Sequence, residues 1–546
     1  MDRVLARQWL LLGVAGLAAC STPMPPSRPV PSFPAVPPVV QPAPSPAPAP
    51  AVPSAVPAVP AVADAVAARF PDPVVTYRVP VLQDSNRSGF TTQAELQTLV
   101  RGLAANALPG VQLVNLGNSQ RGVPLEALLF TQSPDPSGAA LQRSGRPTVL
   151  LLGQTHGDEP AGAEALLVVA QELARGSLRS LLDRINVLVL PRANPDGAQA
   201  GTHATANGVD IDRDQLLLGS PETQALARLL REYQPAVVVD AHEYAPIGNY
   251  AQKFGAVPRH DALLQYAGTA NLAPFITKAA EEWFREPLLA SLKQQGLSAE
   301  WAYTTSADVA DKRLSMGGTQ ADSVRNAGGL RNAVSLVVES RGAGLGRAQI
   351  KRRVHTQVVA LTSVLESAAS RGADLLKLRQ YVEAEVSAQV CQGQAVVEAG
   401  LTPSEYTLLM LDPTTGADKS LTVNWDSSLA LRDLKVRARP CGYWLAADQA
   451  DAVARLRLLG VRVDKVTVTG VLQAEAYSDA SHTASALVDA PVGSHYVPLS
   501  QPLAHLAMAA LEPDAPGSYF ANGVILDLRK MARVMALPGV KMSPVP

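Results

Sequence analysis

The sequence predicts an α/β fold with a largely parallel, buried sheet between about residue 91 and residue 368. Short, continuously apolar stretches, typical of buried strands, alternate there with longer stretches that carry apolar residues on one helical face. Polar side chains directly follow several of the apolar stretches. The 546 residues exceed the roughly 100 to 200 of a usual domain, so we expect more than one folding unit.

The expected elements alternate along the chain. Strands are expected at residues 111–116, 125–131, 148–152, 185–190, 236–239 and 334–338. Helices are expected at residues 91–103, 160–175, 221–233, 281–295 and 348–368. Because strands that are joined through helices run parallel and are covered on both faces, this order predicts helices on both sides of the sheet.

Polar residues at the ends of these strands form a candidate metal site. His156 and Glu159 follow the strand at residues 148–152, and Pro160 should begin a helix and leave Glu159 in the turn. His242 follows a second strand, and Glu339 ends a third. Ligands bind beyond the carboxyl ends of such strands, and two histidines with one glutamate form a catalytic zinc set that keeps a position open for water.

Residues 91–368 resemble the bacterial branch of the zinc carboxypeptidases related to carboxypeptidase A. The motifs that carry the resemblance are HGDE at 156–159, NPDG at 194–197, GVDIDRD at 208–214, DAHE at 240–243 and VESR at 338–341. The resemblance implies a mixed, largely parallel eight-stranded sheet flanked by helices, and Zn²⁺ on His156, Glu159 and His242. It also implies that Glu339 is the general base of a metallopeptidase that acts in proteolysis near a chain end.

The substrate-binding residues depart from the family pattern. The family holds the substrate carboxylate with an Asn-Arg pair, which is Asp212-Arg213 here, and an arginine that assists the carbonyl is replaced by His203. Arg213 suits a carboxylate, whereas Asp212 would repel one. We therefore hypothesise that Asp212 and Arg213 together read a substrate end with both an ammonium and a carboxylate, such as the diaminopimelate of cell-wall peptides.

Other residues have simpler interpretations. The family's tyrosine has no clear match, because Tyr303 lies too far upstream of Glu339. Arg352 and Arg353, beside His355, are interpreted as a solvated helix face. Asn194 and Asp196 are interpreted as groups that fix a turn or orient a ligand histidine.

The front of the chain predicts export. Residues 1–20 have the basic start and short apolar run of a signal peptide, and they end in a lipobox-like LAAC with Cys20 as the lipidation site. Residues 21–65 form a Pro/Ala-rich linker. We expect a lipoprotein that is anchored to a bacterial membrane through Cys20 alone and faces the periplasm. The alternative is an ordinary cleaved signal in which Cys20 is incidental.

Residues 66–375 are expected to form the catalytic domain, and residues 376–546 a smaller β-rich α+β domain of unknown role. Strand-like stretches at 395–398, 406–411, 421–425 and 465–472 accompany a helix at 448–459. Cys391 and Cys441 form either a disulfide or two buried thiols. We expect the domain to cap the cleft, to bind cell wall, or to pack on the catalytic domain.

The leading interpretation is a zinc-dependent carboxypeptidase that acts on a peptide or peptidoglycan-peptide substrate. Two alternatives stay open: a zinc amidase or deacylase on a non-peptide amide, and a catalytically inactive cell-wall-binding protein. The formal net charge of −1 provides no basic field for nucleic acid, so we expect no nucleic-acid partner.

Overall fold

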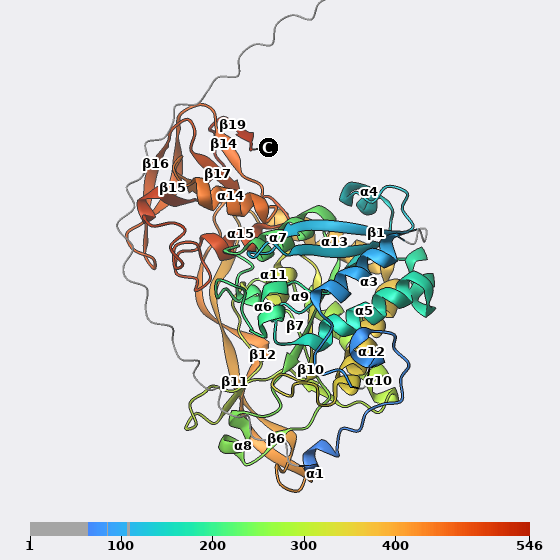
Figure 1. Ribbon diagram of the computed structural model, residues 1–546. Coiled ribbons are helices and arrows are strands. Elements are labelled where there is room, and N and C mark those ends of the chain that lie inside the picture. Colours follow the sequence, from blue (N-terminus) through green and yellow to red (C-terminus); the bar gives the residue numbers. More distant parts are fainter. Residues whose placement is uncertain (1–63, 85, 106–109, 546) are drawn as a thin grey trace, which may run out of the picture. The chain divides into compact units, whose positions relative to one another are not determined.

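A mixed eight-stranded sheet forms the centre of the computed structural model, which describes residues 64–84, 86–105 and 110–545 (Figure 1). Its strands, in spatial order, are β1 (Val111–Asn118), β2 (Pro124–Phe130), β4 (Asn186–Leu190), β3 (Thr148–Gly153), β5 (Val237–Tyr244), β10 (Val334–Arg341), β7 (Ala262–Tyr266) and β8 (Ala299–Trp301). Neighbours from β4 to β10 run parallel, and β7 and β8 are parallel to each other. The outer pairs β1–β2 and β2–β4 and the pair β10–β7 are antiparallel, so the predicted mixed, largely parallel sheet is confirmed.

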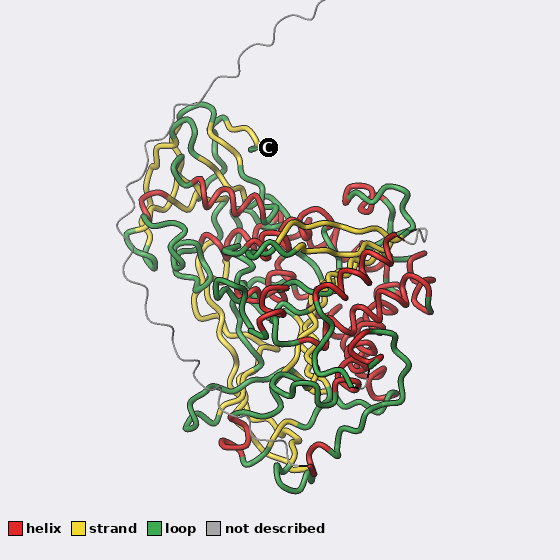
Figure 2. The backbone as a smooth tube through the Cα atoms, viewed as in Figure 1, coloured by secondary structure: helices red, strands yellow, loops and turns green. Residues whose placement is uncertain are grey.

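Helices cover both faces of this sheet. One face packs against α3 (Gln93–Ala105), α5 (Pro160–Arg175), α10 (Glu286–Gln294) and α12 (Ile350–Ser370). The other face packs against α4 (Gly138–Arg143), α7 (Pro221–Tyr233) and α11 (Val324–Leu330). Alternate strand residues enter the two cores, as in β5, where Val237 and Val239 face the first helix layer and Val238 the second. Figure 2 shows these helices in red beside the strands in yellow.

Several short elements complete this region. The helices are α1 (Asp64–Ala67), α2 (Pro80–Gln83), α6 (Pro195–Ala200), α8 (Asn249–Phe254) and α9 (Pro274–Ala279), and α9 continues into α10 through a π-helical turn, Ala280–Arg285. Short 3₁₀-helices lie at Ser177–Asp183 and Ile211–Arg213. The predicted helix at 281–295 is therefore the second part of a longer helical segment, because Pro274 begins it earlier.

A long hairpin joins the C-terminal region to the region of the eight-stranded sheet. Its strands, β11 (Gln394–Leu411) and β12 (Asp418–Ala438), pair with β6 (Val257–Pro258) and β9 (Arg313–Ser315) in a four-stranded sheet. The strand-like stretches predicted at 395–398, 406–411 and 421–425 are pieces of these two strands. The predicted boundary between residues 375 and 376 falls within α13 (Gly372–Ala388), and the domain limits remain a prediction.

The rest of the C-terminal region is built on an antiparallel seven-stranded sheet. Its spatial order is β16 (Thr483–Ala490), β15 (Gly470–Tyr477), β18 (Met531–Val534), β13 (Gly442–Leu445), β17 (His495–Pro498), β14 (Asp464–Val466) and β19 (Met542–Pro544). Helices α14 (Ala450–Leu458) and α15 (Ala504–Leu511) and a short turn at Leu528–Lys530 accompany it. The β-rich α+β architecture predicted for this region is confirmed.

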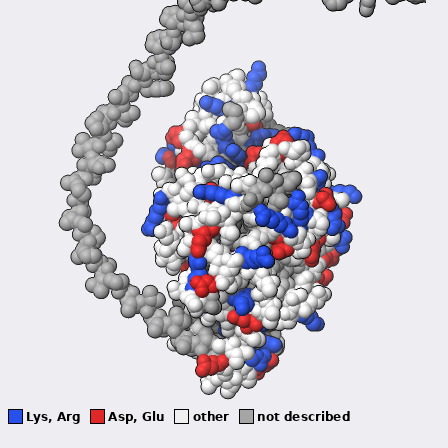
Figure 3. Space-filling view, turned by 45° about the vertical axis from the view of Figure 1, so that its right-hand side comes forward, with Lys and Arg blue, Asp and Glu red and all other residues white. Residues whose placement is uncertain are grey.

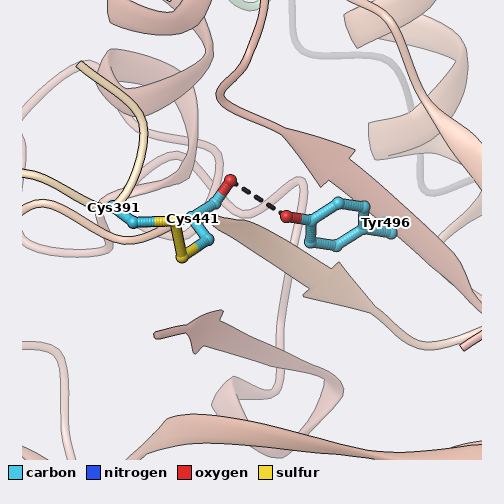
Figure 4. The surroundings of a disulfide bond; sticks show 3 residues. All are labelled: Cys391, Cys441 and Tyr496. Atoms are coloured by element: carbon cyan, nitrogen blue, oxygen red, sulfur yellow. Dashed lines mark hydrogen bonds between the residues drawn. A yellow bond between two sulfur atoms is a disulfide. The ribbon is translucent and has the colours of Figure 1, made fainter. Parts of the chain in front are cut away.

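Cys391 and Cys441 form a disulfide, which decides between the two alternatives left by the sequence (Figure 4). Cys391 follows α13, and Cys441 directly precedes β13, so the bond ties the helix to the seven-stranded sheet. The hydroxyl of Tyr496 donates a hydrogen bond of 2.9 Å to the carbonyl oxygen of Cys441.

The predicted signal peptide with Cys20, and all but the last two residues of the predicted linker, lie outside the described residues. Among the described residues, no helix is both long and apolar enough to cross a membrane. Lys and Arg residues are interspersed with Asp and Glu residues on the face drawn in Figure 3.

Candidate metal centre and substrate cleft

The turn between β3 and α5 presents His156 and Glu159. Glu159 has φ −112° and ψ 75° and directly precedes Pro160, the first residue of α5, as predicted. Gly157 packs so closely on the neighbouring loop that a Cβ atom there would lie 2.1 Å from the carbonyl carbon of Gly197. Only glycine fits at this position, so the path of the turn depends on it.

The donor atoms of three residues from two strand ends converge. His156 Nδ1 lies 2.9 Å from Glu159 Oε1, and His242 Nδ1 lies 3.0 Å from Glu159 Oε2. The two Nδ1 atoms are 3.1 Å apart. All three residues are buried. They meet because β3 and β5 are adjacent parallel strands that bring their carboxyl ends to the same edge of the sheet.

The second nitrogen of each histidine faces a carboxylate. His156 Nε2 lies 3.2 Å from Asp210 Oδ1, and His242 Nε2 lies 2.7 Å from Asp240 Oδ2. Such outer carboxylates orient metal-ligating histidines and raise their basicity. The backbone N–H of Glu243 donates to Glu159 Oε2 at 2.9 Å, which fixes the carboxylate as well.

The charges of this cluster are strongly coupled. Burial would lower the pKa of His242, but Asp240 and Glu159 outweigh it and hold that pKa well above its usual range. Burial likewise opposes the rise that Asp210 and Glu159 cause in the pKa of His156. Burial would raise the pKa of Glu159, yet the histidines lower it. Glu159 is therefore ionised, as a metal ligand must be.

His156, Glu159 and His242 fit a catalytic zinc ion. They provide two imidazole nitrogens and one carboxylate, the donor set that such sites use with a fourth position open. Their donor atoms already lie within hydrogen-bonding distance of one another, and their orientation is fixed from outside by Asp210 and Asp240.

Glu339 is placed beside this cluster by the register of the sheet. It pairs with His242 across the parallel strands β10 and β5, so both side chains point to the same face. Burial raises the pKa of Glu339 to about 7, with opposition from positive charge on His242 and Arg325. Arg341, two residues further along β10, lies with its guanidinium carbon 4.1 Å from the ring centre of Phe70.

A cleft of about 430 Å³ opens over the cluster and contains the predicted carboxylate-binding pair. Arg213 lines this cleft with its side chain half exposed, and its Nη1 lies 3.5 Å from Asp212 Oδ2. The other oxygen of Asp212 accepts a hydrogen bond of 2.9 Å from the backbone N–H of Val324, which begins α11. Asp212 thus also fixes the position of α11.

His203 lies on the outer side of the cluster rather than among the residues that line the cleft. Its ring stacks on His156 with the ring centres 3.5 Å apart. Asp158 and Asp210 raise the pKa of His203 to about 10, so the imidazole is protonated at neutral pH. The structure therefore does not bring His203 together with Arg213 and Glu339 on the cleft wall.

Two side chains that sequence reasoning missed line the cleft. Tyr303 is buried, and its hydroxyl has no hydrogen-bond partner among the described residues, although the sequence separation from Glu339 had argued against it. Arg325 is buried on the same wall. The stretch at 317–326 offers no strand or ligand motif, and its polarity alone gave no signal for Arg325.

The interpretation of Arg352, Arg353 and His355 as a solvated helix face is wrong. Arg353 forms a buried ion pair with Glu243, and Arg352 pairs with Asp261. His355 shares a hydrogen bond of 2.7 Å with the hydroxyl of Tyr77. These groups are covered because the first turns of α12 pack against the end of β5 and against the segment before α3.

Asn194 and Asp196 hold the neighbouring loop, as expected. Asn194 accepts from the N–H of Gly197 at 2.9 Å and donates to the carbonyl oxygens of Thr155 and His203, each at 3.2 Å. Asp196 accepts from the hydroxyl of Ser119 at 2.8 Å. Neither residue reaches the three converging donor atoms.

This chain is similar to known zinc carboxypeptidases. Residues 98–321 match the model of the zinc carboxypeptidase family. Carboxypeptidase 2 of Trichophyton rubrum is 28% identical over 400 residues, covering 69% of this chain and 74% of the relative. Human carboxypeptidase D is 29% identical over 226 residues, covering 33% of this chain and 16% of the relative.

Solved structures of carboxypeptidases are also similar to this chain. A metallo-carboxypeptidase from Pseudomonas aeruginosa, in complex with (2-guanidinoethylmercapto)succinic acid, has 19% identity and a TM-score of 0.37 over 52% of this chain and 69% of that one. Carboxypeptidase A from Helicoverpa armigera has 14% identity and a TM-score of 0.39 over 52% of this chain and 74% of that one. The matched segment, the fungal relatives and the mixed eight-stranded sheet agree, and they support a zinc carboxypeptidase domain related to carboxypeptidase A within this chain.

Proposed function

We propose that this chain hydrolyses a peptide bond near a chain end, with a zinc ion on His156, Glu159 and His242 and with Glu339 as the general base. The observation that carries the proposal is the convergence of the three donor atoms at 2.9 to 3.1 Å, beside a strand that presents Glu339. The segment that matches the zinc carboxypeptidase family and the similar fungal carboxypeptidases support the reaction class.

A zinc ion held by His156, Glu159 and His242 would supply Lewis acidity to the scissile carbonyl and to a water molecule. Glu339 takes a proton from the attacking water and delivers it to the leaving nitrogen. Its pKa of about 7 suits a group that must accept and then release a proton near neutral pH. Arg213 holds the carboxylate at the substrate end, because it lines the same cleft and a guanidinium can donate two parallel hydrogen bonds.

Zinc content and the activity of a Glu339→Gln variant test this function. The wild-type chain should bind one zinc ion and hydrolyse blocked peptides. Glu339→Gln should keep zinc but lose roughly 10² to 10⁴ of kcat, the usual contribution of acid–base catalysis. Glu366→Gln, an exposed change on α12, is the matched control and should leave both unchanged.

Other outcomes select the alternative functions. If zinc is bound but wild type and Glu339→Gln are equally inactive on every amide tested, the chain is a binding protein. Hydrolysis of acylated non-peptide amides with no hydrolysis of peptides would instead support an amidase or deacylase.

For the substrate, we propose a cell-wall peptide that ends in diaminopimelate. The motivation is the pairing of opposite charges in Asp212 and Arg213, 3.5 Å apart on the cleft, which suits an end with both an ammonium and a carboxylate. Hydrolysis of a diaminopimelate-ending muropeptide should exceed that of a blocked dipeptide that ends in an ordinary L-amino acid. Preference for the blocked dipeptide would contradict the proposal.

We also propose that the chain is exported and lipid-anchored through Cys20, with its body in the periplasm. The Cys391–Cys441 disulfide supports an oxidising compartment. Growth with labelled palmitate should label the wild-type chain and leave Cys20→Ser unlabelled, and membrane fractions should lose the variant. Equal recovery of both proteins in the soluble periplasmic fraction would instead support an ordinary cleaved signal.

A further inference from the structure

Arg325 is a buried cation on the wall of the substrate cleft. The residue is 8% exposed, and its Nη2 donates a hydrogen bond of 3.2 Å to the carbonyl oxygen of Gly318. No ion pair joins it to a carboxylate within the described parts of the chain. Buried Arg353 and Arg533 each contact a glutamate, whereas buried Arg341 and Arg439 also have no ion pair among the described residues but do not line this cleft.

A buried charge that no carboxylate contacts directly is costly, so we expect a contacting partner from outside the chain. Burial lowers the pKa of Arg325 to about 10, with opposition from Asp212 and Glu339, and the group is therefore still a cation at neutral pH. Arg325 lines the cleft, so an anion in the cleft can approach its guanidinium.

The surrounding backbone holds the guanidinium in place. Asp212 accepts from the N–H of Val324, and Asn326 donates to the carbonyl oxygens of Gly318 and Gln320 at 3.2 and 2.7 Å. Gly317 has φ +90°, and a Cβ atom there would lie 3.4 Å from Arg325 Nη2. The side chain is thus oriented before substrate binds, which lowers the entropic cost of binding.

Except for Glu339, the proposed base, the other charged groups of the cleft already have partners. Glu159 and Asp240 face the histidines, and Glu243 pairs with Arg353. Asp212 accepts a hydrogen bond from the N–H of Val324 and lies beside Arg213. Beside Glu339, this leaves two guanidinium groups on one cleft: Arg213, half exposed, and Arg325, buried.

We infer that Arg325 binds a second carboxylate, on the side chain of the substrate's terminal residue, while Arg213 binds the terminal carboxylate. The inference rests on the proposed function. The buried guanidinium suits the enclosed side-chain group, and the half-exposed one suits the chain end. The preferred terminal residue is then a dicarboxylic one, as in peptides that end in aspartate, glutamate or diaminopimelate.

The test is a series of blocked dipeptides that differ only in a terminal Glu, Asp, Gln or Leu. Wild-type kcat/KM should be higher for Glu than for Gln by roughly 10² or more, because a site built to pair a charged group discriminates against its neutral analogue. At a pH above the acid limb of both proteins, Arg325→Met should lose roughly 10² on the Glu peptide and change less than about threefold on the Gln and Leu peptides. Arg325→Lys, which keeps the charge but not the fork, should fall between the two.

Arg175→Met, on the exposed end of α5, is the matched control and should behave as wild type. Zinc content and melting temperature establish that each variant is folded. Calorimetry measures binding of the uncleaved Glu and Gln peptides without hydrolysis. The Glu339→Gln enzyme should bind the Glu peptide more tightly than the Gln peptide. The Glu339→Gln, Arg325→Met double variant should lose this preference.

Three outcomes overturn the inference. A wild-type preference for Gln or Leu over Glu would overturn the inference and leave the proposed peptidase function intact. Equal losses on all peptides in Arg325→Met would assign Arg325 to a group common to every substrate. A zinc-loaded wild type that hydrolyses no peptide and binds none would overturn the proposed function together with the inference. If the inference holds, the ratio of activity on Glu-ending and diaminopimelate-ending peptides identifies which dicarboxylic source is preferred.

Discussion

His242 Nδ1 lies 3.0 Å from Glu159 Oε2, although 83 residues separate them in the chain. The contact depends on the register of two adjacent parallel strands, in which Leu152 of β3 pairs with Asp240 of β5. The strand ends therefore fix the geometry of the candidate metal centre before any ion binds.

Removing one donor should remove metal-dependent stability. Zinc added to the metal-free wild-type chain should raise its melting temperature, since a ligand present at 1,000 times its Kd stabilises a fold by about 4 kcal/mol. His242→Ala should show no such rise and should lose activity. The exposed His482→Ala variant is the control and should respond to zinc as wild type does. An unchanged response in His242→Ala would contradict the assigned donor set.

Asp240 should tune the metal affinity without ligating. Its Oδ2 lies 2.7 Å from His242 Nε2, so Asp240→Asn weakens the orientation and basicity of the imidazole. We expect zinc affinity to fall by about 10- to 100-fold, the usual effect of changing such a group. Competition with a zinc chelator measures it. Asp479→Asn, beside exposed His482, supplies the control pair, and equal affinities in the two variants would contradict this role.

Glu243, the neighbour of His242, should contribute to stability rather than to chemistry. Its carboxylate is buried against Arg353, with Nε at 2.7 Å and Nη2 at 2.8 Å, and it also accepts from the N–H of Ala161. Glu243→Gln breaks a buried pair, which should lower the free energy of unfolding by about 3 to 5 kcal/mol. Thermal or denaturant unfolding measures this loss. Glu339→Gln should be nearly as stable as wild type, and a Glu243→Gln chain of wild-type stability would refute the prediction.

Sequence reasoning could predict the converging strand ends because the signal is local. Apolar stretches identify the buried strands, and parallel strands share a carboxyl edge, so His156, Glu159, His242 and Glu339 were expected together. Their chemical roles remain predictions that the zinc and variant measurements test.

Arg325 could not be predicted in this way. Its place on the cleft depends on α11, a short helix whose start is held by Asp212, 112 residues earlier than Val324. The burial of Arg353 likewise depends on a distant partner, Glu243, which the periodicity of α12 does not contain. Charged residues on a helix are usually exposed, so local pattern alone favoured the wrong environment.

The pH dependence of activity should report the charge around Glu339. The base must be ionised, so kcat/KM should be full at high pH and should fall as pH drops through the pKa of Glu339, which burial raises to about 7. The positive charge of Arg325 lowers that pKa. Arg325→Met should therefore move the acid limb to higher pH, measured on a Gln-ending peptide. An acid limb at the same pH in both proteins would contradict the coupling.

The long hairpin should affect substrate binding through the wall of the cleft. Trp425 on β12 stacks on Tyr406 with ring centres 4.6 Å apart and lies 5.8 Å from the ring centre of Tyr303. It pairs with Leu314 of β9, and the next residue, Asp426, accepts from the N–H of Met316 at 3.0 Å. The hairpin thereby supports the loop that contacts Arg325.

Trp425→Ala should lower the free energy of unfolding by about 3 to 5 kcal/mol, as is usual for a buried aromatic residue. It should also raise KM, because the loop at Gly317 and Gly318 loses support, while zinc content stays unchanged. Trp444→Ala is the matched control, since Trp444 is buried in the seven-stranded sheet and packs in a different core from the cleft wall. It should lose comparable stability and keep the wild-type KM. Equal KM values in the two variants would show that the hairpin stabilises the fold without shaping the cleft.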